Sequence, residues 1–142
     1  MNLAIGSDHA GYEMKTALIP FLKGMGHEIT NYGVDSPDSV DYPDFAHPVA
    51  NAVAEGKHEL GILLCGTGNG VCFTANKHQE IIAALAWNTE VAELVRRHNN
   101  ANILCLPSRF ISTDLAKEIL VAYFAATFEG GRHQRRIDKI PT

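Results

Sequence analysis

A cysteine followed by a glycine-rich turn is the feature of this sequence best suited to chemistry. Cys65 ends the apolar run LGILLC, and the next residues read GTGNG, which places Gly66, Gly68 and Gly70 at alternate positions. Glycines spaced in this way let backbone N–H groups converge on an anion, and a helix starting near residue 70 adds its positive end. Such surroundings favour a thiolate near neutral pH and would stabilise a negatively charged oxygen on a substrate.

Several known glycine-loop chemistries fit this stretch poorly. A P-loop has a lysine directly after its last glycine, whereas the first lysine here is Lys77. The dinucleotide-binding spacing G-x-G-x-x-G differs from the G-x-G-x-G found here. A cysteine-phosphatase loop needs an arginine where this chain has Val71. A thiolate beside such a loop suits covalent attack or removal of a proton from carbon next to a carbonyl, and the simpler alternative is that Cys65 is a small buried core residue.

Carboxylate and imidazole side chains elsewhere are candidates to complete this site. Asp8 and His9 follow the first apolar run, and we expect them near Cys65 if the two strands are neighbours at the switch point of a parallel sheet. Capping of the next helix is the alternative role for Asp8. His98 ends a helical pattern, beside Asn99, and a titrating group held there could serve as general acid or base.

Three arginines are candidates for binding a phosphate group. Arg132 and Arg136 are four residues apart, so one helix face would present both guanidinium groups. A solvated basic tail is the alternative for this pair. Arg109 follows the last apolar run, which places it at the same sheet edge as Cys65. Tyr42 lies in a loop that we expect to cover the crevice at this edge.

Short apolar runs alternate with amphipathic helical patterns along nearly the whole chain. This alternation predicts an α/β fold in which helices cover both faces of a five-stranded parallel sheet. The predicted strands are residues 3–6, 28–33, 60–65, 81–86 and 102–107. The predicted helices are residues 11–24, 43–55, 89–98 and 113–128, with another starting near residue 70. We expect a single domain over residues 1–142, with residues 130–142 as a basic C-terminal arm that folds back or reaches a second subunit.

Composition and charge argue against several function classes. With 142 residues, 46% hydrophobic content and a net charge of −4, the chain is typical of a folded domain and not of a nucleic-acid-binding surface. No apolar run approaches the roughly 20 residues that span a bilayer and no signal peptide is visible, so we expect no membrane partner. Three cysteines, an odd number at no metal-like spacing, fit a reduced cytoplasmic location better than a disulfide framework. Neither cysteine nor histidine spacing indicates a metal motif, so we expect no metal and no other cofactor.

Five stretches of the chain resemble the ribose/galactose isomerase family: GSDHAGYEMK, DYPDFA, CGTGNGVCFTANK, RRHNNANILCLPSR and EGGRHQRRI. The resemblance covers essentially the whole chain in the expected order. It implies a Rossmann-like three-layer α/β/α sandwich and a metal-free aldose–ketose isomerase of the pentose phosphate pathway, which interconverts D-ribose 5-phosphate and D-ribulose 5-phosphate. It also implies a homodimer or a dimer of dimers with active sites at a subunit interface.

The resemblance also implies roles for the candidate residues. Cys65 matches the base that moves the proton, and His98, together with Asp8, would assist opening of the sugar ring. We expect Thr67 to hydrogen-bond the thiol or a substrate hydroxyl. The predicted substrate-binding residues are Asp8, His9, Tyr42, Gly66, Thr67, Gly68, Asn69, Gly70, Asn99, Arg109, Arg132 and Arg136.

Substrate preference stays open at this point. Family members often carry a bulkier aliphatic residue at the position of Asn69, which affects the expected fit of the sugar. A six-carbon aldose 6-phosphate, such as allose or galactose 6-phosphate, is therefore an alternative substrate. A sugar-phosphate-binding module without catalysis is the non-enzymatic alternative.

Overall fold

In the computed structural model, which describes residues 1–142, five strands form one parallel sheet with the order β2-β1-β3-β5-β4. The strands are β1 (Asn2–Ser7), β2 (Glu28–Asn31), β3 (Leu60–Cys65), β4 (Ala83–Leu85) and β5 (Ile103–Pro107). Every residue of β3 and β5 is buried, because these strands lie inside the sheet with helices over both faces. The edge strand β2 is largely exposed.

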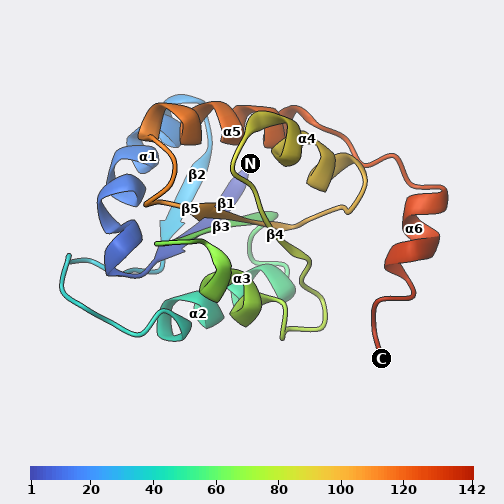
Figure 1. Cartoon of the computed structure of the whole chain (residues 1–142), viewed down its shortest axis with the longest axis horizontal. Coiled ribbons are helices and arrows are strands. Elements are labelled where there is room, and N and C mark those ends of the chain that lie inside the picture. Colours follow the sequence, from blue (N-terminus) through green and yellow to red (C-terminus); the bar gives the residue numbers. More distant parts are fainter.

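Helices cover the sheet in two layers (Figure 1). α1 (Tyr12–Gly24), α4 (Thr89–Arg97) and α5 (Thr113–Ala125) lie on one face, and α2 (Pro43–Ala54) and α3 (Asn69–Ala75) lie on the other. Successive strand residues point to opposite faces, so the sheet separates a core of 17 buried residues from one of 13. A single turn of 3₁₀ helix, η1 (His9–Gly11), precedes α1, and α6 (Arg132–Ile137) stands away from the layers.

The predicted α/β sandwich with five parallel strands is confirmed, and the differences lie at the two edges of the sheet. β2 ends at Asn31 and β4 is limited to Ala83–Leu85, so both are shorter than predicted. Ahead of β4 the backbone N–H of Ile82 donates to the side-chain oxygen of Asn102 at 2.9 Å, so a side chain takes the place of a neighbouring strand there. No helix is both long and apolar enough to cross a bilayer.

The strand order places the ends of three strands side by side. Ser7 at the end of β1 is in register with Leu64, and Cys65 at the end of β3 is in register with Pro107 of β5. The chain leaves β1 toward β2 on one side, whereas β3 lies on the other side, so the strand order reverses at β1. In open parallel sheets, ligands bind at such a reversal, outside the carboxyl ends of the strands.

Candidate active site

Cys65 lies at the middle of the carboxyl edge of the sheet, and the residue is only 5% exposed. It is part of the smaller core, as the simpler interpretation predicts, and it is also the last residue before the glycine loop. The backbone N–H of Ser108 donates to the carbonyl oxygen of Cys65 at 3.0 Å, and Ser108 Oγ lies 2.9 Å from the carbonyl oxygens of both Cys65 and Ala10. Ser108 therefore ties together the segments that follow β1, β3 and β5.

The glycines of the loop let two other residues lie directly against it. A Cβ atom on Gly66 would be 3.1 Å from Nη1 of Arg109, and one on Gly70 would be 2.7 Å from the ring of Tyr42. Gly68 has a φ of +77°, and a Cβ atom there would collide with Leu85. The structure thus brings Arg109 and Tyr42 to the loop after Cys65, as the sequence predicts.

Thr67 and Asn69 are the exposed residues of this loop. Thr67 Oγ1 accepts a hydrogen bond from the backbone N–H of Asn69 at 3.2 Å, at the start of α3. No hydrogen bond joins Thr67 to the thiol of Cys65, which leaves a substrate hydroxyl as the partner to consider for Thr67.

Asp8 and His9 directly follow β1 at the same edge. Asp8 Oδ1 accepts from the backbone N–H groups of Ala10 and Gly11 at 2.9 and 3.1 Å, so the carboxylate caps η1, which is the alternative role that the sequence allows. Its other oxygen, Oδ2, makes no hydrogen bond. His9 Nδ1 accepts from the backbone N–H of Val40 at 3.2 Å. His9 thereby holds the segment that leads to Tyr42 over this edge.

His98 and Asn99 lie at the opposite edge of the sheet. α4 starts after the carboxyl end of β4 and runs back to the amino end of β5, so the residues after its last turn lie at the amino edge. His98 caps the end of α4. A hollow of about 370 Å³ at this place is lined by His98, Asn99, His133, Arg136, Ile137 and Ile140.

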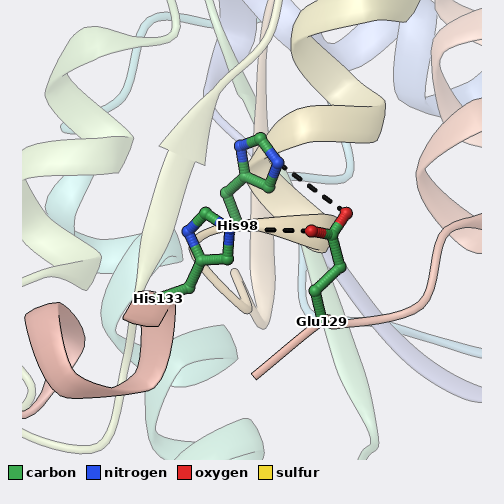
Figure 2. Close-up of side chains that lie close together, drawn as sticks. All are labelled: His98, Glu129 and His133. Carbon is green, nitrogen blue, oxygen red and sulfur yellow. Dashed lines mark ion pairs between the residues drawn. The ribbon is translucent and has the colours of Figure 1, made fainter. Parts of the chain in front are cut away.

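Figure 2 shows how His98 meets the C-terminal segment. The imidazole rings of His98 and His133 are stacked, with centroids 4.2 Å apart and planes 10° apart. The carboxylate of Glu129 faces both rings, at 3.7 Å from Nε2 of His98 and 3.6 Å from Nε2 of His133. Arg132 and Arg136 belong to α6, which carries His133, and both arginines are exposed.

The charges of this cluster are set by Arg97 and by burial. The hydrogen bond from Nε of Arg97 to Oε2 of Glu129, 2.7 Å long, is the main cause of a lowered pKa for Glu129, so this carboxyl group is ionised at neutral pH. Burial is the main cause of the lowered pKa of His133, and the neighbouring His98 and Arg132 lower it further.

The predicted site residues therefore form two groups within one chain. Asp8, His9, Tyr42, the loop 65–70 and Arg109 lie at the carboxyl edge, whereas His98, Asn99, Arg132 and Arg136 lie at the amino edge. Glu129 and His133 are not among the site residues predicted from the sequence. Both stand in the stretch EGGRHQRRI, but their contact with His98 crosses more than 30 residues of chain, and no local spacing signals it.

A match to a known protein family shows to which family this chain belongs. The profile of the Ribose/Galactose Isomerase family matches residues 3–140. The chain belongs to this family. The match covers all the residues of both groups.

Similar proteins of known structure have the same fold over nearly their whole length. A ribose-5-phosphate isomerase B from Clostridium thermocellum superposes with a TM-score of 0.97 at 46% identity, covering 99% of this chain and 95% of that one. A ribose-5-phosphate isomerase B from Mycoplasma genitalium with bound ribulose-5-phosphate gives a TM-score of 0.94 at 46% identity, covering 98% and 93%. A relative named D-erythrulose-4-phosphate isomerase, from Pectobacterium atrosepticum, is 41% identical over 99% of this chain and 93% of its own length.

Proposed function

We propose that this protein is an aldose–ketose isomerase that interconverts D-ribose 5-phosphate and D-ribulose 5-phosphate, a step of the pentose phosphate pathway. The observation that supports it most is the thiol of Cys65 at the end of β3, between Asp8 and Arg109 and in front of a glycine loop. The family match and the relative with bound ribulose-5-phosphate point to the same substrate class. Three free cysteines suit work in a reducing cytoplasm.

The reaction moves one proton between neighbouring carbon atoms. The thiolate of Cys65 takes the proton from C2 of the open-chain aldose, and the electron pair of that bond forms a cis-enediolate whose negative charge lies on O1. Transfer of the O2 proton to O1 and return of the proton from the Cys65 thiol to C1 give the ketose and restore the thiolate. Backbone N–H groups of the loop after Cys65 stabilise the enediolate oxygen, where one lost donor typically costs about 3–4 kcal/mol of barrier.

The residues at the amino edge, among them His98 and Asn99, reach the thiol of Cys65 from another copy of the chain. His98 lies at the opposite edge of the sheet from Cys65, so one chain cannot place both on one sugar. A homodimer, alone or within a dimer of dimers, would bring His98 and Asn99 of one copy to the glycine loop of the other. There His98, with Asp8, would assist ring opening, while Arg109, Arg132 and Arg136 bind the phosphate and orient the sugar.

Replacing the thiol tests this function directly. Cys65→Ala is expected to abolish turnover of ribose 5-phosphate and incorporation of solvent deuterium into the sugar, with phosphate-ligand binding nearly intact. Cys72→Ala is the matched control, because Cys72 lies on α3 and its thiol faces the carbonyl oxygen of Ala83 at 3.3 Å. Assays with EDTA present test the metal-free reaction. Deuterium exchange that persists in Cys65→Ala would remove the thiol from the role of base.

A different chain length of the sugar is the second candidate function. One relative, 41% identical to this chain, is named D-erythrulose-4-phosphate isomerase, so proteins of this similarity include one named for a four-carbon sugar. Allose and galactose 6-phosphate are the six-carbon candidates. Side-by-side kcat/KM values are expected to be highest for ribose 5-phosphate, and a higher value for a four- or six-carbon substrate would reassign the substrate while keeping the chemistry.

A further inference from the structure

Three potential metal ligands converge at the amino edge of the sheet (Figure 2). They are His98 after α4, Glu129 in the segment before α6, and His133 within α6. Their ligand atoms all lie within 4.8 Å of one another. The three residues come from separate parts of the chain, which is why neither histidine nor cysteine spacing indicates the cluster.

The geometry of the cluster is close to that of a tetrahedral metal site. Bonds of about 2.0–2.2 Å at a tetrahedral zinc ion hold ligand atoms about 3.4 Å apart. Nε2 of His98 lies 3.7 Å from Oε2 of Glu129, and Nε2 of His133 lies 3.6 Å from Oε1, so each ring already faces one carboxylate oxygen. One ligand atom from each residue lies within 4.8 Å of the other two, so shifts of at most about 1.4 Å bring all three to the tetrahedral separation.

One ligand atom is buried without a partner. The side chain of His133 is more than nine-tenths buried, and its Nε2 makes no hydrogen bond, although it points toward the carboxylate of Glu129. A buried polar atom without a partner costs free energy, and a metal ion would relieve that cost. The site thus contains an unused ligand atom that already faces its neighbours.

Arg97 acts as an outer partner of the cluster. It donates to Oε2 of Glu129 at 2.7 Å, which fixes the carboxylate and leaves Oε1 directed at His133. Carboxylate ligands in metal sites are commonly held by such a hydrogen bond. The exposed Arg132 and Arg136 add positive charge nearby, so we expect moderate affinity, in the micromolar range.

We propose that His98, Glu129 and His133 bind one divalent transition-metal ion of the zinc class, and that this ion inhibits the enzyme by occupying His98. Two imidazoles and one carboxylate are a ligand set typical of Zn²⁺ and leave the fourth position to water. Mg²⁺ and Ca²⁺ prefer oxygen ligands, and we expect them to bind far more weakly here. The inhibition rests on the proposed function of His98, whereas the metal binding does not.

Other metal-binding groups of the chain set the controls. His47 and His78 form a separate exposed pair, with Nδ1 and Nε2 2.7 Å apart, and the thiol of Cys65 also has affinity for zinc. His78→Gln removes the other histidine pair and leaves the proposed site intact. Co²⁺ distinguishes the ligands by its spectrum, because a thiolate ligand adds a sulfur-to-metal charge-transfer band that histidine and glutamate do not give.

Titration calorimetry of the full chain with ZnCl₂ and absorption spectra with Co²⁺ test the binding. The wild type and His78→Gln are expected to bind one ion per chain, with no sulfur band. Glu129→Gln and His133→Gln are expected to weaken binding by at least about tenfold, in keeping with the loss of a metal ligand. Unchanged affinity in Glu129→Gln, or a sulfur band in the wild type, would overturn the site. Glu129→Gln alters an exposed side chain, so the test does not depend on the folding of His133→Gln.

Inhibition is measured separately with ribose 5-phosphate as substrate. Zn²⁺ is expected to inhibit the wild type, EDTA to restore activity, and Glu129→Gln to need at least about tenfold more Zn²⁺ for the same inhibition. Equal inhibition of both proteins would assign the effect to a thiol and overturn the inhibitory role. A wild type that binds zinc at this cluster but turns over no sugar phosphate would contradict the proposed function and leave the metal site standing.

Discussion

Gly68 is the residue on which the conformation of the glycine loop after Cys65 most depends. Its positive φ disfavours any side chain, and the space where a Cβ would lie is filled by Leu85 and by the backbone of β5. Gly68→Ala is therefore expected to combine the cost of a left-handed backbone, about 1–2 kcal/mol, with an overpacking cost of about 1–3 kcal/mol. Urea unfolding measures the change in the free energy of unfolding.

Gly56 provides the matched control for this prediction. It has a φ of +76°, but nothing lies within 4 Å of its Cβ position. In Gly56→Ala the free energy of unfolding should therefore fall only by the cost of the left-handed backbone, and isomerase activity should be retained. Gly68→Ala should also lose activity. Equal losses of stability in the two variants would show that the contact with Leu85 and β5 contributes nothing.

His58 makes the stability of the protein depend on pH. It is buried, and its ring links Asn2 and Tyr32 through hydrogen bonds of 2.8 Å at each nitrogen. Burial is the main cause of its lowered pKa, so the unfolded chain binds a proton here more readily than the folded protein does. The stability contributed by neutral His58 is complete above its ordinary pKa of about 6.5 and is lost as pH falls from there through the lower folded pKa.

Urea unfolding at pH 7.5 and pH 5.5 tests this sign. The wild type is expected to be less stable at the lower pH, and His58→Gln is expected to show a smaller difference between the two pH values. His27, His78 and His133 also have lowered pKa values, so part of the dependence should remain in the variant. An unchanged pH difference in His58→Gln would contradict the assignment to His58.

The elements matter because they bring residues from distant parts of the chain to one edge. Ser108, just after β5, bonds the carbonyl oxygens of Cys65 and Ala10, and so fixes the end of β3 against the segment after β1. Ser108→Ala is expected to cost about 0.5–1.5 kcal/mol of stability and to lower kcat, because the thiol loses its fixed position. Urea unfolding and steady-state kinetics measure the two effects.

Ser112 supplies the matched control for the Ser108→Ala prediction. Its side chain caps α5 by accepting from the backbone N–H of Leu115 at 3.0 Å. Ser112→Ala should cost a similar amount of stability, about 1 kcal/mol, with kcat unchanged. A kcat that falls equally in both variants would mean that general destabilisation, and not the position of Cys65, controls the rate.

Most of the elements could be predicted from sequence because their patterns are local. The strand LGILLC over residues 60–65 is visible in the letters, and the structure confirms it. The strand ends at the edges of the sheet could not be predicted, since a side chain such as Asn102 replaces a neighbouring strand there. The cluster of His98, Glu129 and His133 depends on where the segment after α5 travels, and no periodicity records that path.

Within one molecule, the two groups of candidate residues lie at opposite edges of the sheet. The carboxyl edge holds Cys65 and its loop, and the amino edge holds His98 beside α6, which stands apart from the layers in Figure 1. A closed pair of identical chains related by a two-fold axis would form two equivalent sites, each with residues of both copies. We therefore propose that the isomerase site is complete only between two chains.

Mixing two inactive variants tests whether each site contains residues of two chains. Cys65→Ala and His98→Asn chains, refolded together in equal amounts, form mixed dimers in which one site has an intact thiol and an intact histidine. Random pairing makes half of the dimers mixed, so the mixture is expected to recover about a quarter of wild-type activity on ribose 5-phosphate, while each variant alone stays inactive. A mixture shown to contain mixed dimers, yet as inactive as its components, would contradict a site shared between two chains.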